Sequence, residues 1–262
     1  MDHGLLTFMK QIPNLFTLLN LALGFIAIIF ILQIGQTFVF LNEEGVTQVG
    51  LPENIRWGAT LIFCAAIVDF LDGFLARLLK ANSAMGKQLD SLSDVVSFGV
   101  APGLIIYQLL RITFAREENG LDISIIFLLP ALLIPCAAAW RLAKFNIDEG
   151  QKYSFKGLPT PAAGLFIASL PLILWFSSFD LAAYIYNKWV LYLIIILTCF
   201  LMVSNLPLMG MKFKDYSVKN NLPKYLLVII GIVAAIFLQW IAVPILLVAY
   251  VIVSLLFKNK SG

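Results

Sequence analysis

Long runs of apolar residues, separated by short polar segments, make up most of this 262-residue chain. Most of these runs approach the ~20 residues with which an α-helix crosses a bilayer. The pattern predicts membrane-spanning helices over residues 15–34, 56–79, 93–114, 124–145, 161–178, 187–205, 225–240 and 241–257. The last two ranges form a tight hairpin broken near Gln239 and Trp240, and each is short for a complete span. Six spans remain if that hairpin is re-entrant.

Composition agrees with this pattern, because 61% of the residues are hydrophobic and only 13% are charged. Soluble domains are typically about 45–50% apolar and about 25% charged, so a soluble globular protein is excluded. We expect an all-α integral membrane protein with one membrane domain. Its core is predicted over residues 1–215, and residues 216–262 add the C-terminal hairpin to the same bundle. The first apolar run is too long for a cleavable signal peptide, so we expect it to be retained.

Basic residues predict the orientation of the bundle, because Lys and Arg collect in cytoplasmic loops. If the N-terminus is cytoplasmic, all but four of the 18 basic residues fall on the cytoplasmic side. The four on the outer side are Arg56, Arg111, Arg116 and Lys188. This asymmetry predicts that both termini are cytoplasmic and that the number of spans is even.

Four aspartates interrupt the apolar pattern at the cytoplasmic ends of the second and third predicted spans. Asp69 and Asp72 belong to the second span, and Asp90 and Asp94 open the third. A charged side chain near hydrocarbon is energetically unfavourable, which favours a functional reason for keeping it there. At about 100° per residue, each pair lies on one face of its helix. Two antiparallel helices can therefore direct all four carboxylates toward one point.

A divalent cation is the simplest partner for such a cluster, since four close carboxylates cannot all stay ionised without one. Oxygen ligands suit Mg²⁺ or Mn²⁺, and Ca²⁺ fits less well. Four acids also suffice for two metals about 3.5–4 Å apart, an arrangement that clamps the attacking and leaving oxygens of a phosphoryl displacement. For any single aspartate, a helix cap or a pairing with a lysine is an equally good explanation.

Small residues share the acidic faces and leave space beside the carboxylates. They are Gly73 and Ala76 on the second span and Gly86 before the third. Arg77 adds a planar, permanently charged guanidinium that suits phosphate. Metals, an arginine and open space together indicate a site for a pyrophosphate.

The stretch "DFLDGFLARLLKANSAMGKQLDSLSD" at 69–94 fits the pattern D-x-x-D-G-x-x-A-R-x8-G-x3-D-x3-D at every fixed position. In these residues the chain resembles the CDP-alcohol phosphatidyltransferase family. The resemblance implies a six-helix membrane core, usually dimeric, with a dinuclear metal site facing the cytoplasm. It also implies transfer of a phosphoalcohol group from a CDP-linked donor to a hydroxyl acceptor, with release of CMP.

Carried over residue by residue, the resemblance assigns Asp69, Asp72 and Asp90 as metal ligands and Asp94 as both ligand and general base. The CDP-binding surface that it implies consists of Gly73, Ala76, Arg77 and Gly86. Asn14 and Thr17 lie at the start of the first predicted span. Each either caps that helix or reaches the nucleotide.

Further stretches resemble one branch of the family, whose donor is CDP-diacylglycerol and whose acceptor is L-serine. These stretches lie at residues 12–28, 94–103, 141–146, 157–164, 201–207 and 211–214. The likeness implies a multi-pass protein of the cell (inner) membrane with a cytoplasmic active site, forming a homodimer among membrane lipids. We expect no nucleic-acid partner.

An acceptor site is expected where the fourth span reaches the cytoplasm. Arg141 and Lys144 lie there at the level of the aspartates, with Asn146 as a polar neighbour. The segment "KGLPTPAAG" at 156–164 follows with two prolines, and irregular backbone at membrane depth is tolerated where it lines a cavity. A cation at this position suits the carboxylate of serine. The alternative is that Arg141 and Lys144 only anchor lipid phosphates.

Two other functions stay open from sequence. Glycerol 3-phosphate or inositol can replace serine as acceptor, since several basic residues cluster near Arg141. A cation- or proton-coupled transporter also uses intramembrane acids, although it would place them near the bilayer midplane rather than at one interface.

Overall fold

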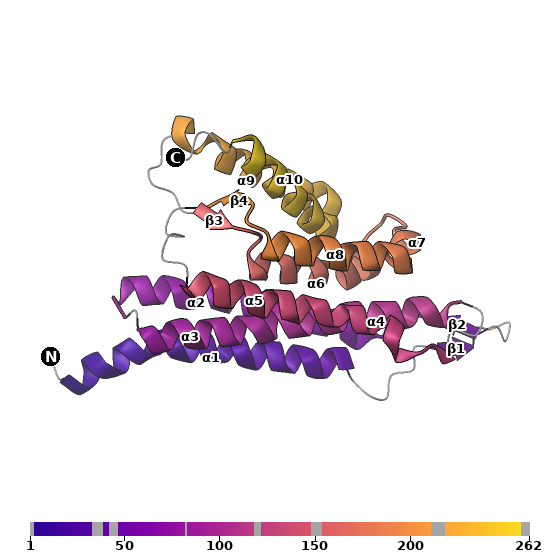
Figure 1. The fold of residues 1–262 in the computed structure, drawn as a ribbon, viewed down its shortest axis with the longest axis horizontal. Helices are drawn as coiled ribbons and strands as arrows, with labels where there is room; N and C mark the ends of the chain where they lie inside the picture. Colours follow the sequence, from indigo (N-terminus) through magenta and orange to yellow (C-terminus); the bar gives the residue numbers. More distant parts are fainter. Residues whose placement is uncertain are drawn as a thin grey trace.

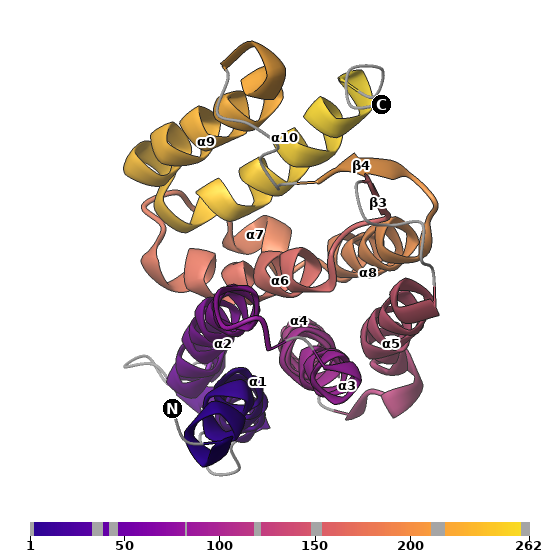
Figure 2. The same ribbon diagram turned by 90° about the vertical axis from the view of Figure 1, so that its left-hand side faces the viewer.

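The computed structural model describes residues 3–32, 39–41, 47–81, 83–117, 122–147, 154–210 and 218–257. Long helices run side by side along the length of the molecule (Figure 1). Seen end-on, α1 to α5 lie together, α6 and α8 cover them, and α9 and α10 form an outer layer on α6 (Figure 2). The molecule is therefore a layered helical bundle, as expected for an all-α membrane protein.

The first half of the chain supplies the lower part of the bundle in Figure 1. Its elements are α1 (His3–Leu32), α2 (Glu53–Leu78), α3 (Ala84–Asp94), the π-helical turn η1 (Val95–Val100), α4 (Ala101–Ala115), the short 3₁₀ turns η3 (Ile125–Phe127) and η4 (Leu129–Leu132), and α5 (Leu133–Ile147). α3, η1 and α4 form one continuous helical segment.

The second half supplies α6 (Thr160–Phe176), the single turn α7 (Ala182–Ile185), α8 (Lys188–Val203), α9 (Val218–Leu238), the 3₁₀ turn η5 (Gln239–Ile241) and α10 (Ala242–Leu256). α9 and α10 pack against each other as a hairpin, and the chain reverses at η5. Gln239 takes a left-handed φ of 50° at this reversal. The break predicted near Gln239 and Trp240 is confirmed.

Each of the eight predicted ranges contains a helix, but several boundaries were wrong. α1 starts at His3 rather than at residue 15, and the third helical segment starts at Ala84 rather than at residue 93. The fourth range opens with η3 and η4 before α5 begins at Leu133. The proposed domain boundary at residues 215–216 and the motif at 211–214 lie outside the described residues.

Four helical segments of the described chain are long and apolar enough to cross a membrane. They are Gln11–Leu32, Glu53–Leu78, Ala84–Ala115 and Asn221–Leu256, the last of which contains the reversal at η5. Thr160–Phe176 and Lys188–Val203 are shorter apolar helices. The integral membrane character expected from composition is consistent with these segments.

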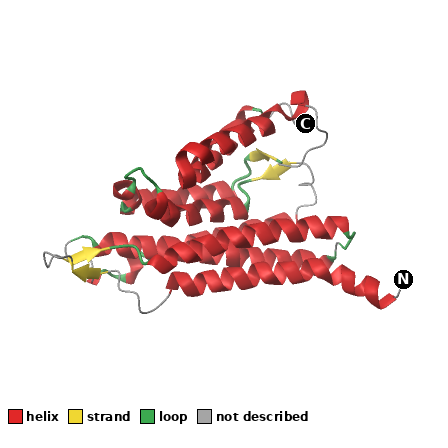
Figure 3. Cartoon of the chain, turned by 180° about the vertical axis from the view of Figure 1, so that it is seen from behind, coloured by secondary structure: helices red, strands yellow, loops and turns green. Residues whose placement is uncertain are grey.

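Two small antiparallel sheets, which the sequence pattern did not predict, lie toward opposite ends of the molecule (Figure 3). β1 (Val39–Leu41) pairs with β2 (Thr47–Val49) in the connection between α1 and α2. β3 (Ser154–Lys156) pairs with β4 (Pro207–Met209), with Ser154 opposite Met209. This second pairing fixes the chain before α6 against the chain after α8.

Gly157 makes the entry into α6 possible. It has a φ of 77°, and a Cβ at this position would lie 2.6 Å from the carbonyl oxygen of Met202. Its amide donates to the Leu206 carbonyl, and the next amide, of Leu158, donates to the Leu201 carbonyl. The segment expected to be irregular is therefore a short strand and a left-handed glycine held against the end of α8, after which α6 starts at Thr160.

Close backbone approaches place the π-helical turn η1 in the centre of the bundle. A Cβ on Gly24 of α1 would lie 2.8 Å from the Ser97 Cα, and one on Gly164 of α6 would lie 2.9 Å from the Phe98 Cα. Phe98 is fully buried and belongs to the main apolar core between these helices. Because η1 directly follows Asp94, this packing also fixes the position of that carboxylate.

Candidate metal centre and substrate site

The turn between α2 and α3 brings the two acidic helix faces together. Lys80 adopts a left-handed φ of 50°, and the Ala81 amide donates to the Ala76 carbonyl, which ends α2. Ser83 then caps α3, because its hydroxyl accepts a hydrogen bond of 2.9 Å from the Gly86 amide. The chain thus reverses within a few residues and sets α3 directly after α2.

Three carboxylates meet beside this turn. One oxygen each from Asp69, Asp72 and Asp90 lie within 4.8 Å of one another. Asp69 and Asp72 are one helical turn apart on α2, and Asp90 comes from α3. Asp72 is buried, with 5% of its surface exposed, whereas Asp69 and Asp90 are half-buried.

The donor set fits a divalent cation. Three close, largely desolvated carboxylates repel one another, and a hard cation with oxygen ligands removes that repulsion. Aspartate oxygens suit Mg²⁺ and Mn²⁺, whereas zinc sites usually include histidine or cysteine. The cluster therefore has the chemistry of a divalent-metal centre.

Asp94 lies one turn beyond Asp90 on α3 and is not one of the three close carboxylates. It is buried, and its Oδ1 accepts a hydrogen bond of 3.5 Å from the Asn20 side-chain amide. It lies close enough to Asp69 and Arg141 to interact electrostatically with both. Asp94 therefore connects the acidic cluster to a cation on α5.

Thr17 reaches the cluster from α1. Its hydroxyl donates a hydrogen bond of 2.7 Å to Asp72 Oδ2, and it also lies 3.1 Å from the Pro13 carbonyl oxygen. Because α1 begins at His3, both Asn14 and Thr17 lie inside the helix, so the alternative that they cap it is wrong.

The small residues of the site have two different roles, since one leaves open space and the other allows two helices to approach closely. At Gly73 an added Cβ would meet only Arg77, at 4.0 Å, so this glycine borders open space. At Gly86 an added Cβ would lie 2.9 Å from Asn14 Oδ1, so this glycine lets α1 approach α3. Ala76 is half-buried on the acidic helix, and the Arg77 side chain is exposed.

The segment that contains these carboxylates matches a known protein family. The family model described as CDP-alcohol phosphatidyltransferase matches residues 10–203. The chain belongs to the CDP-alcohol phosphatidyltransferase family. The resemblance inferred from the aspartate motif is therefore confirmed, and the carboxylate cluster lies within the matched region.

Three relatives of this chain are similar enough to report in detail. It is 38% identical over 120 residues to the CDP-diacylglycerol–serine O-phosphatidyltransferase of Bacillus subtilis, covering 46% of this chain and 63% of the relative. It is 32% identical over 222 residues to the protein of the same name from Mycobacterium leprae, and this match covers 81% of this chain and 68% of the relative. It is 30% identical over 184 residues to the archaetidylserine synthase of Methanothermobacter thermautotrophicus, and this match covers 70% of this chain and 66% of the relative. The matched region thus spans about two thirds of each relative's length.

Arg141 is a buried cation at the edge of the site. Only 7% of its surface is exposed, and its guanidinium donates a hydrogen bond of 3.2 Å to the Thr160 hydroxyl at the start of α6. Its Nε is buried and has no hydrogen-bond partner within the described part of the chain. Such a group favours an anionic ligand, since an unpaired buried donor is energetically unfavourable.

Lys144 and Asn146, the other predicted acceptor residues, bond to different neighbours. Lys144 Nζ donates to Asn205 Oδ1 over 2.6 Å, and the Asn146 amide donates to Ser91 Oγ over 2.8 Å. Lys87 also donates to the Asn146 carbonyl. Both residues therefore tie α5 to neighbouring segments, while Arg141 alone has an electrostatic contact with Asp94.

Sequence reasoning missed four polar contacts of the site. Asn20, Thr160 and Asn205 contact Asp94, Arg141 and Lys144 respectively, and Ser91 contacts Asn146. Asn20 gave a signal, because it is an amide inside an otherwise apolar predicted span. Thr160 and Asn205 lie at helix ends and Ser91 lies in the polar helix α3, and polar residues at such positions are common and carry little information.

Proposed function

We propose that the protein transfers the phosphatidyl group of CDP-diacylglycerol to the hydroxyl of L-serine, forming phosphatidylserine and CMP. The observation that carries this proposal is the cluster of Asp69, Asp72 and Asp90 with Asp94 beside it. The serine acceptor is supported by the printed names of the relatives from Bacillus and Mycobacterium.

Two divalent cations, Mg²⁺ or Mn²⁺, are the proposed cofactors. Asp69, Asp72 and Asp90 would hold them, with Asp94 as a further ligand. Bound there, the cations would neutralise the pyrophosphate of the donor and the charge on the leaving CMP. Thr17 keeps one oxygen of Asp72 in place through its hydrogen bond.

Asp94 is the proposed general base. It accepts the proton of the serine hydroxyl while the serine oxygen forms a bond to the phosphorus that carries diacylglycerol. The bond between that phosphorus and the CMP oxygen breaks, and CMP leaves. General-base catalysis of this kind contributes typically about 10²–10⁴-fold in rate. Burial of Asp94 and its contact with Asn20 support this role, since both limit its movement.

The donor nucleotide is proposed to bind along the acidic face of α2 and the start of α3. Gly73 borders open space there, and the exposed Arg77 lies beside it. A guanidinium suits the phosphates of CDP. Ala76, Gly86, Asn14 and Thr17 complete this proposed surface.

Arg141 is the proposed ligand of the serine carboxylate. It is buried beside Asp94 and has an unpaired Nε among the described residues, so it has a free donor close to the proposed base. Lys144 and Asn146 are proposed to border the same acceptor space from their positions on α5. Serine bound at Arg141 would have its hydroxyl within the neighbourhood of Asp94.

We further propose eight spans in the cell (inner) membrane, with both termini and the active site cytoplasmic and with a homodimer as the assembly. The start of α1, the turn between α2 and α3, and the β3–β4 sheet lie toward the same end of the bundle (Figure 1). Among the described residues, Arg77, Lys80, Lys87 and Lys144 belong to the segments at that end, which favours its placement in the cytoplasm.

The test uses purified protein in detergent with CDP-diacylglycerol and Mg²⁺ or Mn²⁺. CMP release is followed with L-serine, glycerol 3-phosphate, inositol or no acceptor, for the wild type and for Asp94→Asn. Release that depends on serine and is lost in Asp94→Asn is the expected result. Release with another acceptor would overturn the serine assignment. If folded protein releases no CMP with any acceptor, the proposed transferase activity is overturned and the transporter alternative is favoured.

A further inference from the structure

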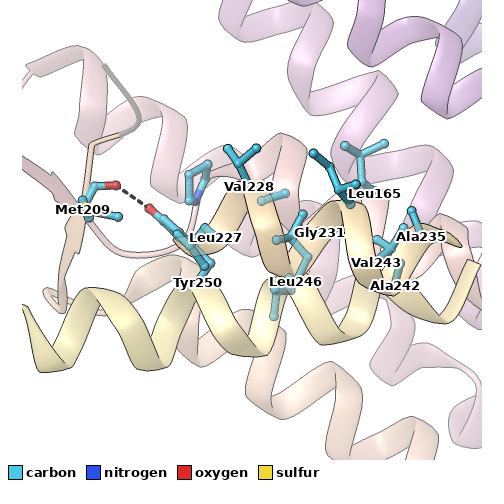
Figure 4. A pocket seen from close by; sticks show the side chains of 14 residues that line it. Leu165, Met209, Leu227, Val228, Gly231, Ala235, Ala242, Val243, Leu246 and Tyr250 are labelled. Atoms are coloured by element: carbon cyan, nitrogen blue, oxygen red, sulfur yellow. Dashed lines mark hydrogen bonds between the residues drawn. The ribbon is translucent and has the colours of Figure 1, made fainter. Parts of the chain in front are cut away.

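An apolar cavity separates the C-terminal hairpin from α6. It has a volume of about 720 Å³ and is lined by α6, α9, α10 and the end of β4. Figure 4 shows its lining side chains, with Leu227, Val228 and Gly231 from α9 facing Leu246 and Tyr250 from α10. The volume falls within the roughly 300–1,000 Å³ usual for ligand sites.

The lining selects for hydrocarbon. The only side-chain hydroxyl that lines the cavity is that of Tyr250, and it donates to the Met209 carbonyl over 2.9 Å (Figure 4). The Met209 amide donates a hydrogen bond of 3.2 Å to the Ser254 hydroxyl oxygen. Apart from this hydrogen-bonded Tyr250 hydroxyl, the described residues of the lining present apolar side chains, so hydrocarbon is the chemistry that fits.

The cavity has a polar end and an apolar end. Tyr250 and Met209 lie at the first, and Ala242 and Ala235 lie at the second, next to the reversal at η5 (Figure 4). Tyr250 lies eight residues after Ala242, which corresponds to about 12 Å of helix at ~1.5 Å per residue. The cavity is therefore elongated along the hairpin.

The cavity adjoins the proposed active site. Pro159 of its lining directly precedes Thr160, whose hydroxyl accepts a hydrogen bond from Arg141. Arg141 interacts electrostatically with both Tyr250 and Asp94. A molecule in the cavity would thus have one end beside the cation of the site and the rest between apolar helices.

We propose that this cavity binds one acyl chain of the diacyl lipid donor, with the glycerol end of the chain toward Tyr250 and the chain end toward Ala235. The proposal rests on the proposed function, since it assigns part of the same substrate. The elongated shape, the apolar lining and the position beside Arg141 all agree with a hydrocarbon chain attached to a phosphate. The C-terminal hairpin, which lies outside the residues that match the family, then forms one wall of the lipid site.

Two valines of α9 supply a matched test. Val228 lines the cavity and Val233 does not, although their side chains are similarly exposed, at 45% and 49%. Val228→Phe places a ring in the cavity, whereas Val233→Phe adds the same ring on another face of the helix. Gly231→Leu is a second filling variant, since a Cβ at Gly231 meets Leu246 only at an ordinary contact of 3.4 Å.

The first measurement is direct binding. CDP-diacylglycerol with a photoreactive diazirine near the end of one acyl chain is added to wild-type protein in detergent, and the cross-linked peptides are mapped. We expect cross-links on the cavity-lining residues of α9 and α10. These cross-links should be lost in Val228→Phe and Gly231→Leu but kept in Val233→Phe. Cross-links elsewhere, or equal labelling of all variants, would overturn the acyl-chain assignment.

The second measurement separates this proposal from the proposed function. With a dioleoyl donor, the KM for that donor is expected to rise about tenfold in the two filling variants, because a few methylene groups of its acyl chain lose their apolar contact with the cavity. With a dihexanoyl donor, whose chains do not reach the far end, KM should stay near the wild-type value. If wild-type protein shows no serine-dependent turnover but the cavity is labelled, the proposed function fails and lipid binding stands. Normal turnover with no chain-length effect of Val228→Phe would overturn the cavity proposal alone.

Discussion

The hydroxyl of Thr17 donates a hydrogen bond of 2.7 Å to Asp72 Oδ2, across 55 residues of sequence. It joins α1 to the carboxylate cluster of α2 and α3. Partners that orient a metal-ligating carboxylate typically change metal affinity about 10–100-fold when they are removed. Thr17 is therefore expected to affect the metal requirement rather than the chemistry itself.

Thr17→Val should raise the Mn²⁺ concentration that gives half-maximal CMP release by about 10–100-fold. Thr17→Ser keeps the hydroxyl and should stay near the wild type. Thr113→Val is a matched control, because Thr113 is an equally buried threonine whose hydroxyl donates to the Leu109 carbonyl on α4. An unchanged Mn²⁺ titration for Thr17→Val would show that the hydrogen bond does not orient a ligand.

Asn20→Ala should lower kcat by up to about 100-fold with little change in KM, since a small displacement of a reacting group can have an effect of that size. Asn20 is fully buried and donates to Asp94 Oδ1, so its loss frees the proposed base to move. Gln108→Ala removes another amide donor, one that bonds the Ile31 carbonyl away from the acidic cluster. If steady-state kinetics show that both substitutions lower kcat equally, the role of Asn20 is purely structural.

Gly164→Ala should destabilise the protein by about 1–3 kcal/mol, because the new methyl group overlaps the Phe98 backbone. Gly231→Ala introduces the same methyl group at an ordinary contact distance and should be nearly neutral. Thermal unfolding in detergent measures the difference. CMP release should fall in parallel for Gly164→Ala, since η1 adjoins Asp94; equal unfolding temperatures for the two variants would contradict the packing argument.

Arg141→Lys should raise KM for serine by about tenfold or more, because a lysine loses the planar guanidinium that bonds Thr160 and can bind a carboxylate. Lys144→Gln should change it by no more than about threefold, since Lys144 lies at the edge of the site and glutamine can still donate to Asn205. Titration of serine at saturating donor gives both values. If Lys144→Gln raises KM for serine more than Arg141→Lys does, the acceptor site lies nearer Asn205 than proposed.

Chelation supplies a test of the metal centre that does not depend on the acceptor. EDTA should abolish CMP release, and excess Mg²⁺ or Mn²⁺ should restore it. Asp90→Asn, which removes one of three close carboxylates, should not regain full activity at any practical metal concentration. Full activity after exhaustive chelation would exclude a metal-dependent reaction.

Much of the helical architecture follows from the sequence, because the apolar runs are local and long. Each predicted range contains a helix, and the break at Gln239 was also predicted. The helix ends were less accurate, since α1 and α3 begin in segments with mixed polarity. The sheets β1–β2 and β3–β4 gave no recognisable signal, because strands of three residues contain too few positions to show alternation.

The acidic faces were also accessible from sequence. Residues three and four apart lie on one face of any helix, so Asp69 with Asp72, and Asp90 with Asp94, had to share faces. The residue types then indicated a hard divalent cation. Family membership followed from the same motif and is borne out by the match over residues 10–203.

The tertiary structure alone decided what surrounds those faces. Thr17 and Asn20 come from α1, Arg141 comes from α5 and Thr160 from α6, and none of these contacts has a periodicity that a single sequence reveals. They depend on how closely helices distant in sequence approach, which here is set by Gly24 against Ser97 and Gly164 against Phe98. The sequence by itself thus determined the helices and their chemical faces, because those depend on neighbours along the chain. The packing of helices determined the partners of each carboxylate and the apolar cavity beside them, because those depend on side-chain volume across the bundle.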